Sequence, residues 1–143
     1  MGNTANVQIR NKARQHVREL LANYSLLKSE NEALREMIMN PHRESDDNIG
    51  GGKSSVTMFE VEEKAIKLAS HEQIKFRSIA LAVIDKVLAE SSDHAQRIIE
   101  LKYFSNEPKS WVAVAHEIEG YSEDGCRKIE KRVVDRIAQR LGW

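Results

Sequence analysis

The sequence predicts an all-α protein, and three observations support that prediction. Charged residues make up 31% of the 143 positions, and Ala, Leu, Glu, Lys and Arg, which favour helices, are frequent. Only two prolines, Pro41 and Pro108, are present to interrupt helices. Apolar residues recur at intervals of three and four through several long stretches. Because only 6% of the residues are aromatic, we do not expect one large globular core.

Residues 1–40 are predicted to form an N-terminal amphipathic helix. Its apolar seam alternates spacings of three and four, which is the a/d pattern of a coiled coil, and it places an Asn at an a position. The seam therefore predicts a homodimer, whose contact residues would be Leu20, Tyr24, Leu27, Asn31 and Leu34. The same pattern also fits a helix that packs on this chain's own helices, with Asn31 at a solvated edge.

Four cations, Arg10, Lys12, Arg14 and Arg18, lie at the start of this helix. A basic-zipper protein would place its DNA-reading residues at such a position. Because little else supports that comparison, we interpret these cations as a solvated basic end.

Residues 41–58 are predicted to form a flexible, Gly-rich linker, since they combine turn formers, charges and three consecutive glycines. The GGGKSS stretch resembles the end of a phosphate-binding loop, whose first Gly would fall at position 47. That residue is Asp47, and no strand pattern precedes it. Nucleotide binding is therefore not predicted.

Residues 59–143 are predicted to form one helical domain. Its first helix, from Phe59 to Ser91, has the apolar spacing of a scaffold helix. A second helix begins near Ala95 and ends after Phe104, before Pro108. The remaining residues supply the part of the domain to which we assign a function.

A helix-turn-helix is predicted at residues 109–141. A short apolar helix pattern precedes Gly120, and Ser122 is a good N-cap for the helix that follows. This second helix can enter a DNA major groove. Projected at about 100° per residue, its inward face consists of Cys126, Ile129, Val133 and Ile137.

The opposite face of this helix is basic, although the whole chain has a formal net charge of zero. From Gly125 to the C-terminus there are six Lys and Arg residues and two acidic residues, so the local charge is 6 − 2 = +4. Such a concentration of cations is expected for phosphate neutralisation. The predicted DNA-binding residues are Ser122, Glu123, Asp124, Arg127, Lys128, Lys131, Arg132 and Arg136.

These residues divide into two roles by position. The N-terminal part of a recognition helix reaches base edges, so Glu123, Asp124, Arg127 and Lys128 are the candidate base readers. The later cations, Lys131, Arg132 and Arg136, are candidate phosphate contacts. The alternative is a solvated basic face on an ordinary helical hairpin.

The segments IIELKYF (98–104) and YSEDGCRKIEKRVVDRIAQRL (121–141) resemble the last region of sigma-seventy-type factors, which reads the promoter −35 element. They are closer still to the RinA and ArpU type of small phage regulators. SDDNIGGG in the linker and the helix ending VLAESS are also similar, so the resemblance covers roughly residues 24–141. It implies a transcriptional activator of late or packaging genes, with double-stranded DNA and host RNA polymerase as partners.

Two other functions are open, a small terminase subunit for DNA packaging and a protein-interaction adaptor. An enzyme is not expected, because the sequence has no paired-carboxylate motif, no HExxH and no His or Cys cluster at metal spacing. No cofactor or metal is predicted. The single Cys and the lack of a long apolar run favour a protein of the bacterial host's cytoplasm with no membrane contact.

Overall fold

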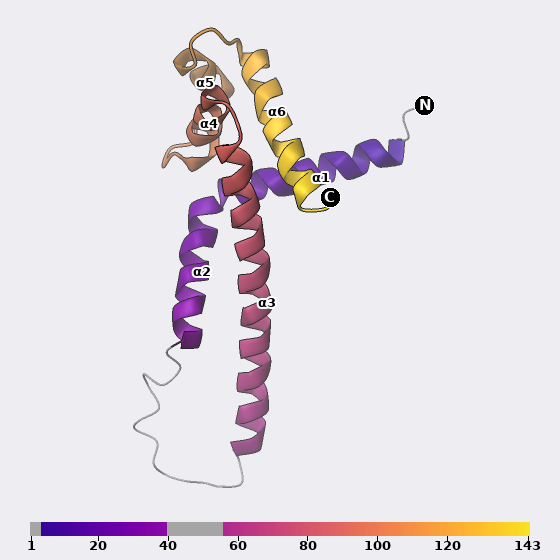
Figure 1. The fold of residues 1–143 in the computed structure, drawn as a ribbon, viewed down its shortest axis with the longest axis vertical. Helices are drawn as coiled ribbons and strands as arrows, with labels where there is room; N and C mark the ends of the chain where they lie inside the picture. The colour runs from indigo at the N-terminus through magenta and orange to yellow at the C-terminus, as the bar shows by residue number, and fades with distance from the viewer. Residues whose placement is uncertain (1–3, 40–55) are drawn as a thin grey trace. The chain divides into compact units, whose positions relative to one another are not determined.

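The computed structural model describes residues 4–39 and 56–143, and in these ranges the chain is helical, with no strand (Figure 1). The all-α prediction is confirmed. The helices are α1 (Thr4–Ala22), α2 (Tyr24–Met39), α3 (Val56–Ala89), α4 (Asp93–Ile99), the π-helical turn η2 (Glu100–Phe104), α5 (Trp111–Glu117) and α6 (Glu123–Arg140).

The chain divides into two compact units that differ from the predicted segments. Unit 1 combines Met1–Leu27 with Ala80–Trp143, and unit 2 is Lys28–Ile79. Both boundaries fall inside helices, namely α2 and α3. The predicted division at residues 40 and 58 followed the Gly-rich stretch, most of which lies outside the described residues.

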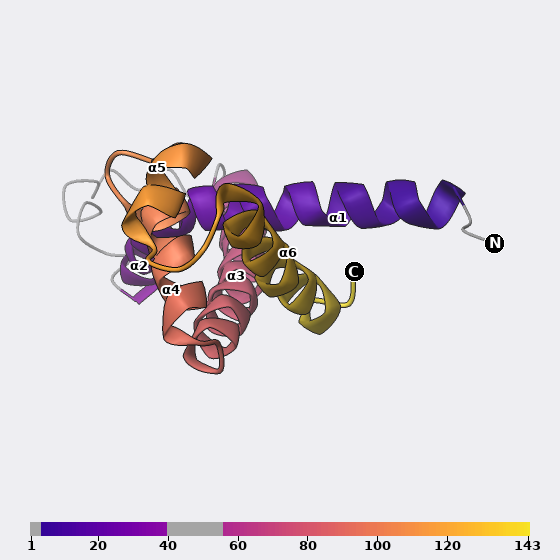
Figure 2. The same cartoon turned by 90° about the horizontal axis from the view of Figure 1, so that it is seen from above.

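Unit 1 has its main core where α1 and the end of α3 meet α4 and α6. Figure 2 shows α1 beside α6, and the two helices share many contacts. Apolar burial of this kind supplies most of the stabilisation of short helices. The buried residues of this core are Val17, Leu20, Leu21, Ala80, Ile84, Val87, Ala95, Ile99, Val133, Val134, Ile137 and Ala138.

A smaller cluster joins α4, η2, α5 and α6. It contains Ile98, Leu101, Val114, Ile118 and Cys126, all of them buried. Serine side chains cap the helices of this region, since Ser92 accepts from the Ala95 N–H and Ser110 from the Ala113 N–H.

Between α4 and the next loop the helix widens into a π turn. The Ser105 N–H donates to the Glu100 carbonyl at 2.9 Å, which is an i to i−5 bond. The turn carries Tyr103, whose hydroxyl reaches α6. The sequence predicted an ordinary helix across these residues.

Unit 2 is a pair of helices, α2 and the first part of α3, held by polar contacts. Asn31, which is 5% exposed, donates through Nδ2 to Ser78 Oγ at 3.0 Å. Arg35 donates to the same oxygen at 2.7 Å. Arg77 and Glu30 form an ion pair at 3.1 Å.

The predicted single N-terminal helix is interrupted at Asn23. Its side-chain Nδ2 and its backbone N–H both donate to the Glu19 carbonyl, at 2.9 and 3.0 Å. Asn side chains compete with the backbone for such carbonyls, which explains a local break between α1 and α2.

The predicted dimer seam packs within the chain. Leu20 belongs to the unit 1 core, and Tyr24 and Leu27 pack against it. Asn31 is buried in unit 2, not at a solvated edge, and Leu34 is half-buried. Since the seam faces this chain's own helices, the intramolecular interpretation of the pattern fits the structure. A homodimer stays a prediction, and it would need other side chains.

Candidate nucleic-acid interface

Helix α6 begins after a short turn whose geometry follows from two residues. Gly120 has φ of +87°, a conformation that favours glycine. Ser122 then caps α6, because its Oγ accepts from the Gly125 N–H at 3.1 Å. A Cβ at position 125 would lie 3.3 Å from that oxygen, so Gly125 leaves room for the cap.

The predicted inward face of α6 is confirmed. Cys126 and Ile137 are fully buried, Val133 is 5% exposed, and Ile129 is partly buried against both clusters. In the preceding helix, Val114 is buried but Val112 is 66% exposed, so Val112 does not contribute to the core.

The cations of α6 all lie on its exposed side. They are Arg127, Lys128, Lys131, Arg132, Arg136 and Arg140. Of these, Arg140 pairs with Glu90, which directly follows α3. Among the described residues, Lys131, Arg132 and Arg136 form no ion pair within the chain. Their charges therefore face solvent.

The four predicted base readers form two ion pairs on the first turns of α6. Arg127 Nη2 lies 2.7 Å from Glu123 Oε1, and Lys128 Nζ lies 3.2 Å from Asp124 Oδ2. Both pairs have the acid four residues before the cation, which is the favourable order in a helix. The structure thus brings these residues together, with each cation held by an acidic neighbour.

Glu130, which the sequence analysis did not single out, is the best-connected residue of α6. It is 2% exposed and accepts from Arg18 Nη2 at 2.9 Å and from the Tyr103 hydroxyl at 2.6 Å. A signal was available, because Glu130 follows Cys126 by four residues and so falls on the inward face. A buried carboxylate in that position needs partners.

A second arginine of α1, Arg14, binds Asp135, which is the other acidic residue between Gly125 and the C-terminus. Arg14 Nε and Nη2 donate to the two carboxylate oxygens of Asp135 at 2.6 and 3.2 Å, a bidentate arrangement. The prediction of a solvated basic end is therefore wrong for Arg14 and Arg18. Both acidic residues between Gly125 and the C-terminus are thus bound by arginines of α1, and neither forms an ion pair with a cation of α6.

An open pocket of about 550 Å³ lies beside these groups. Trp111 forms part of its wall, with Lys102 Nζ 5.0 Å and Arg127 Cζ 5.9 Å from the ring centroid, so two cations lie within reach of cation–π attraction. The full lining is Arg18, Tyr103, Trp111, Asp124, Arg127, Lys128, Glu130 and Lys131. The pocket therefore adjoins three predicted base readers, one predicted phosphate contact, and the hydrogen-bonded group of Arg18, Tyr103 and Glu130.

Burial and the bond to Glu130 raise the pKa of Tyr103 above its usual value. A raised folded-state pKa means that the contribution of this phenol to stability is complete below the unfolded value of about 10 and is lost as pH rises further. The free energy of unfolding should therefore fall above about pH 10. Tyr103→Phe should make this fall smaller, as measured by urea denaturation at several pH values.

The control for this prediction is Tyr121→Phe, at a tyrosine that is 40% exposed. If both variants change the alkaline pH dependence equally, the Tyr103–Glu130 bond is not its cause.

Among residues 4–39 and 56–143, no group of three or more His, Cys, Asp or Glu side chains could hold a metal ion. In the same residues no helix has the length and apolar character needed to cross a membrane.

Cys126 is buried, and its burial raises the pKa of the thiol. The exposed cations of α6 and the adjoining pocket form the candidate interface.

Comparison with known proteins identifies one family. The model of the family described as "Protein of unknown function (DUF722)" matches residues 13–139. No curated protein and no solved structure matches the chain. The matched residues include α6, the turn before it, and the arginines of α1 that bind its acidic side chains. Because the match covers most of its length, this chain belongs to the DUF722 family.

Proposed function

We propose that this chain is a sequence-specific DNA-binding protein that reads double-stranded DNA through α6 and activates transcription. The observation that carries the proposal is the arrangement of charge on α6. Its cations face solvent, while Glu130 and Asp135 are bound by arginines of α1. A helix that follows a tight turn and has Lys131, Arg132 and Arg136 exposed without an ion pair among the described residues has the properties expected of a recognition helix.

In this proposal Ser122 contacts DNA backbone at the N-terminus of α6, where free N–H groups favour phosphate. Arg127 and Lys128 donate to guanine, and Glu123 and Asp124 either accept from cytosine or hold the two cations in place. Lys131, Arg132 and Arg136 contact phosphates. The ion pair between Arg127 and Glu123 supports this assignment, because it orients the guanidinium before DNA arrives.

The proposal extends to the genes that are controlled. The resemblance of residues 98–104 and 121–141 to the RinA and ArpU type supports activation of late or packaging genes of a phage or prophage. Host RNA polymerase is the second proposed partner. A reporter gene placed behind DNA selected by the protein should be transcribed more strongly when the protein is present.

The DNA proposal is tested by selecting bound fragments from a random pool and measuring their affinity at several salt concentrations. We expect one preferred sequence and a steep decrease of affinity with salt, since each neutralised phosphate contributes about 0.9 to the logarithmic slope. Lys131→Ala should lower that slope by about 1 for every sequence. Arg127→Ala should instead cost about 1–3 kcal/mol on the preferred sequence and relax the preference.

The control variant is Lys28→Ala, at an exposed lysine of α2 in unit 2. It should leave the slope and the preference unchanged. Binding that is independent of salt, or a pool that yields no preferred sequence, would contradict the proposal.

A further inference from the structure

One face of α3 in unit 2 exposes three large apolar side chains. Leu68 is 64% exposed, Phe76 is 48% exposed and Ile79 is 51% exposed. At about 100° per residue, all three fall within an arc of about 80°. Exposed apolar residues that line up in this way mark an interaction surface more often than isolated ones do.

This apolar face points away from α2. Within unit 2, Arg77 and Ser78 of α3 bind α2 through Glu30 and Asn31. On a helical projection, Arg77 and Ser78 lie about 150° and 110° from the centre of the apolar face. The pairing of α2 with α3 therefore leaves the face uncovered.

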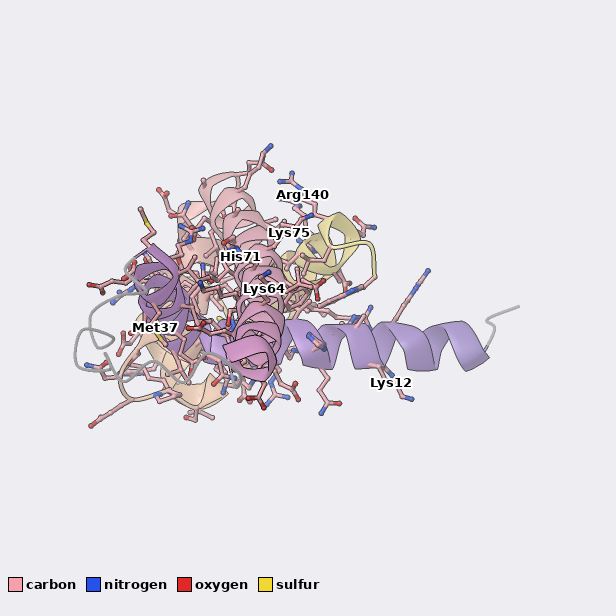
Figure 3. The ribbon with its side chains drawn as sticks, turned by 90° about the horizontal axis from the view of Figure 1, so that it is seen from below. Lys12, Met37, Lys64, His71, Lys75 and Arg140 are labelled. Atoms are coloured by element: carbon pink, nitrogen blue, oxygen red, sulfur yellow. The ribbon has the colours of Figure 1, made fainter. Side chains whose placement is uncertain are left out.

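Two charged residues, Glu72 and Lys75, lie beside these apolar side chains. Their order along α3 matters for the direction in which a second helix could pair with this face. At about 100° per residue Glu72 projects within this arc and Lys75 about 20° outside its edge, and both are exposed. Within the described residues, neither of them forms an ion pair. Figure 3 looks along α3 and labels Lys75 among its side chains.

We propose that this face binds the same face of a second copy of the chain, with the two α3 helices antiparallel. A two-fold interface requires that residue i of one copy meets residue j of the other, and the reverse. If Leu68 lies opposite Ile79 of the second copy, then Glu72 lies opposite Lys75 of that copy, twice by symmetry. A parallel pair would instead place Glu72 against Glu72 and Lys75 against Lys75.

The register also gives Phe76 a place in the interface. Phe76 borders a hollow of about 520 Å³ whose other lining residues include Glu72 and Arg77. In the antiparallel arrangement Phe76 lies at the level of position 71 of the other copy, next to Glu72 of that copy. The inference does not depend on DNA binding, because it uses contacts of unit 2 alone.

Charge exchange tests the inference on the full chain. Sedimentation equilibrium of the unchanged protein should approach twice its 16.3 kDa mass as the concentration rises through the micromolar range. Glu72→Lys and Lys75→Glu should each raise the dissociation constant by about 10-fold or more, because each creates two like-charge contacts. The double variant carrying both changes should restore association. Glu63→Lys, at an exposed residue on the opposite side of α3, should have no effect.

Two results would overturn the inference. One is a monomer at every concentration, which would leave the face open to a different partner. The other is association that the single charge variants do not weaken, or that the double variant does not restore. Circular dichroism of each variant confirms that the helices are retained, as expected for changes at exposed positions.

Cysteine cross-linking tests the register separately. A mixture of Leu68→Cys and Ile79→Cys chains should form an intermolecular disulfide, since these positions face each other. Either variant alone should not, because the two copies of one position are separated by about 16 Å along the helix axis, which is too far for a disulfide. The native Cys126 is buried and should not take part. A disulfide formed by one variant alone would exclude the proposed register.

Discussion

Replacing Glu130 with alanine should lower the free energy of unfolding by about 3 kcal/mol. The Tyr103 hydroxyl and the Arg18 guanidinium both lose their acceptor, and neither has another acidic partner among the described residues. The Arg18 side chain is 41% exposed, so water replaces part of what it loses. We therefore expect the low end of the range for breaking a buried ion pair. Urea denaturation followed by far-ultraviolet circular dichroism measures the change.

The matched control is Glu123→Ala. It removes the same side chain from the same helix and breaks a carboxylate–arginine pair at 2.7 Å, but the two side chains are 42% and 55% exposed, whereas Glu130 is buried. Its cost should be below about 0.5 kcal/mol. Glu130→Gln, which keeps an acceptor but loses the charge, should fall between the two. Equal costs for Glu130→Ala and Glu123→Ala would show that burial of Glu130 is not important for stability.

Reversing two charges on the exposed face of α6 should nearly abolish DNA binding. In the double variant Lys128→Glu and Lys131→Glu, two proposed contacts become repulsive toward phosphate, and a neighbouring acidic residue, Asp124, is released from its pair. We expect the affinity for the selected DNA to fall by about 100-fold or more at moderate salt. Fluorescence anisotropy with a labelled duplex measures this loss.

A variant with the same change in total charge separates local from overall electrostatics. Lys28→Glu with Lys67→Glu changes two exposed lysines of unit 2. It should weaken binding by only a few-fold through long-range repulsion, which salt screens. If both double variants bind equally poorly, α6 is not the DNA-binding helix.

The parts of this protein that follow from local sequence were predictable. Ser122 caps α6 through a neighbour three residues away, and the inward residues Cys126, Val133 and Ile137 repeat at helical spacing. Signals of this kind need no knowledge of the rest of the chain. For the same reason the helical class and the place of the turn were predictable.

What depends on distant residues was not predictable. The role of Glu130 requires Arg18, which is 112 residues away in the sequence. The seam from Leu20 to Leu34 fits a partner helix equally well in a second chain or in the same chain, because the a/d pattern records only which face is covered. The π turn that places Tyr103 has no local sequence signature, so an ordinary helix was the natural expectation.

The discontinuous make-up of unit 1 has a consequence for how the chain folds. Arg14 and Asp135 are 121 residues apart, so α1 emerges from the ribosome long before its partner helix exists. Until α6 has been synthesised, the apolar side of α1 has no α6 to cover it, and a chain truncated before Glu123 should remain incompletely folded. The C-terminal helix is therefore required for the N-terminal helix to find its place.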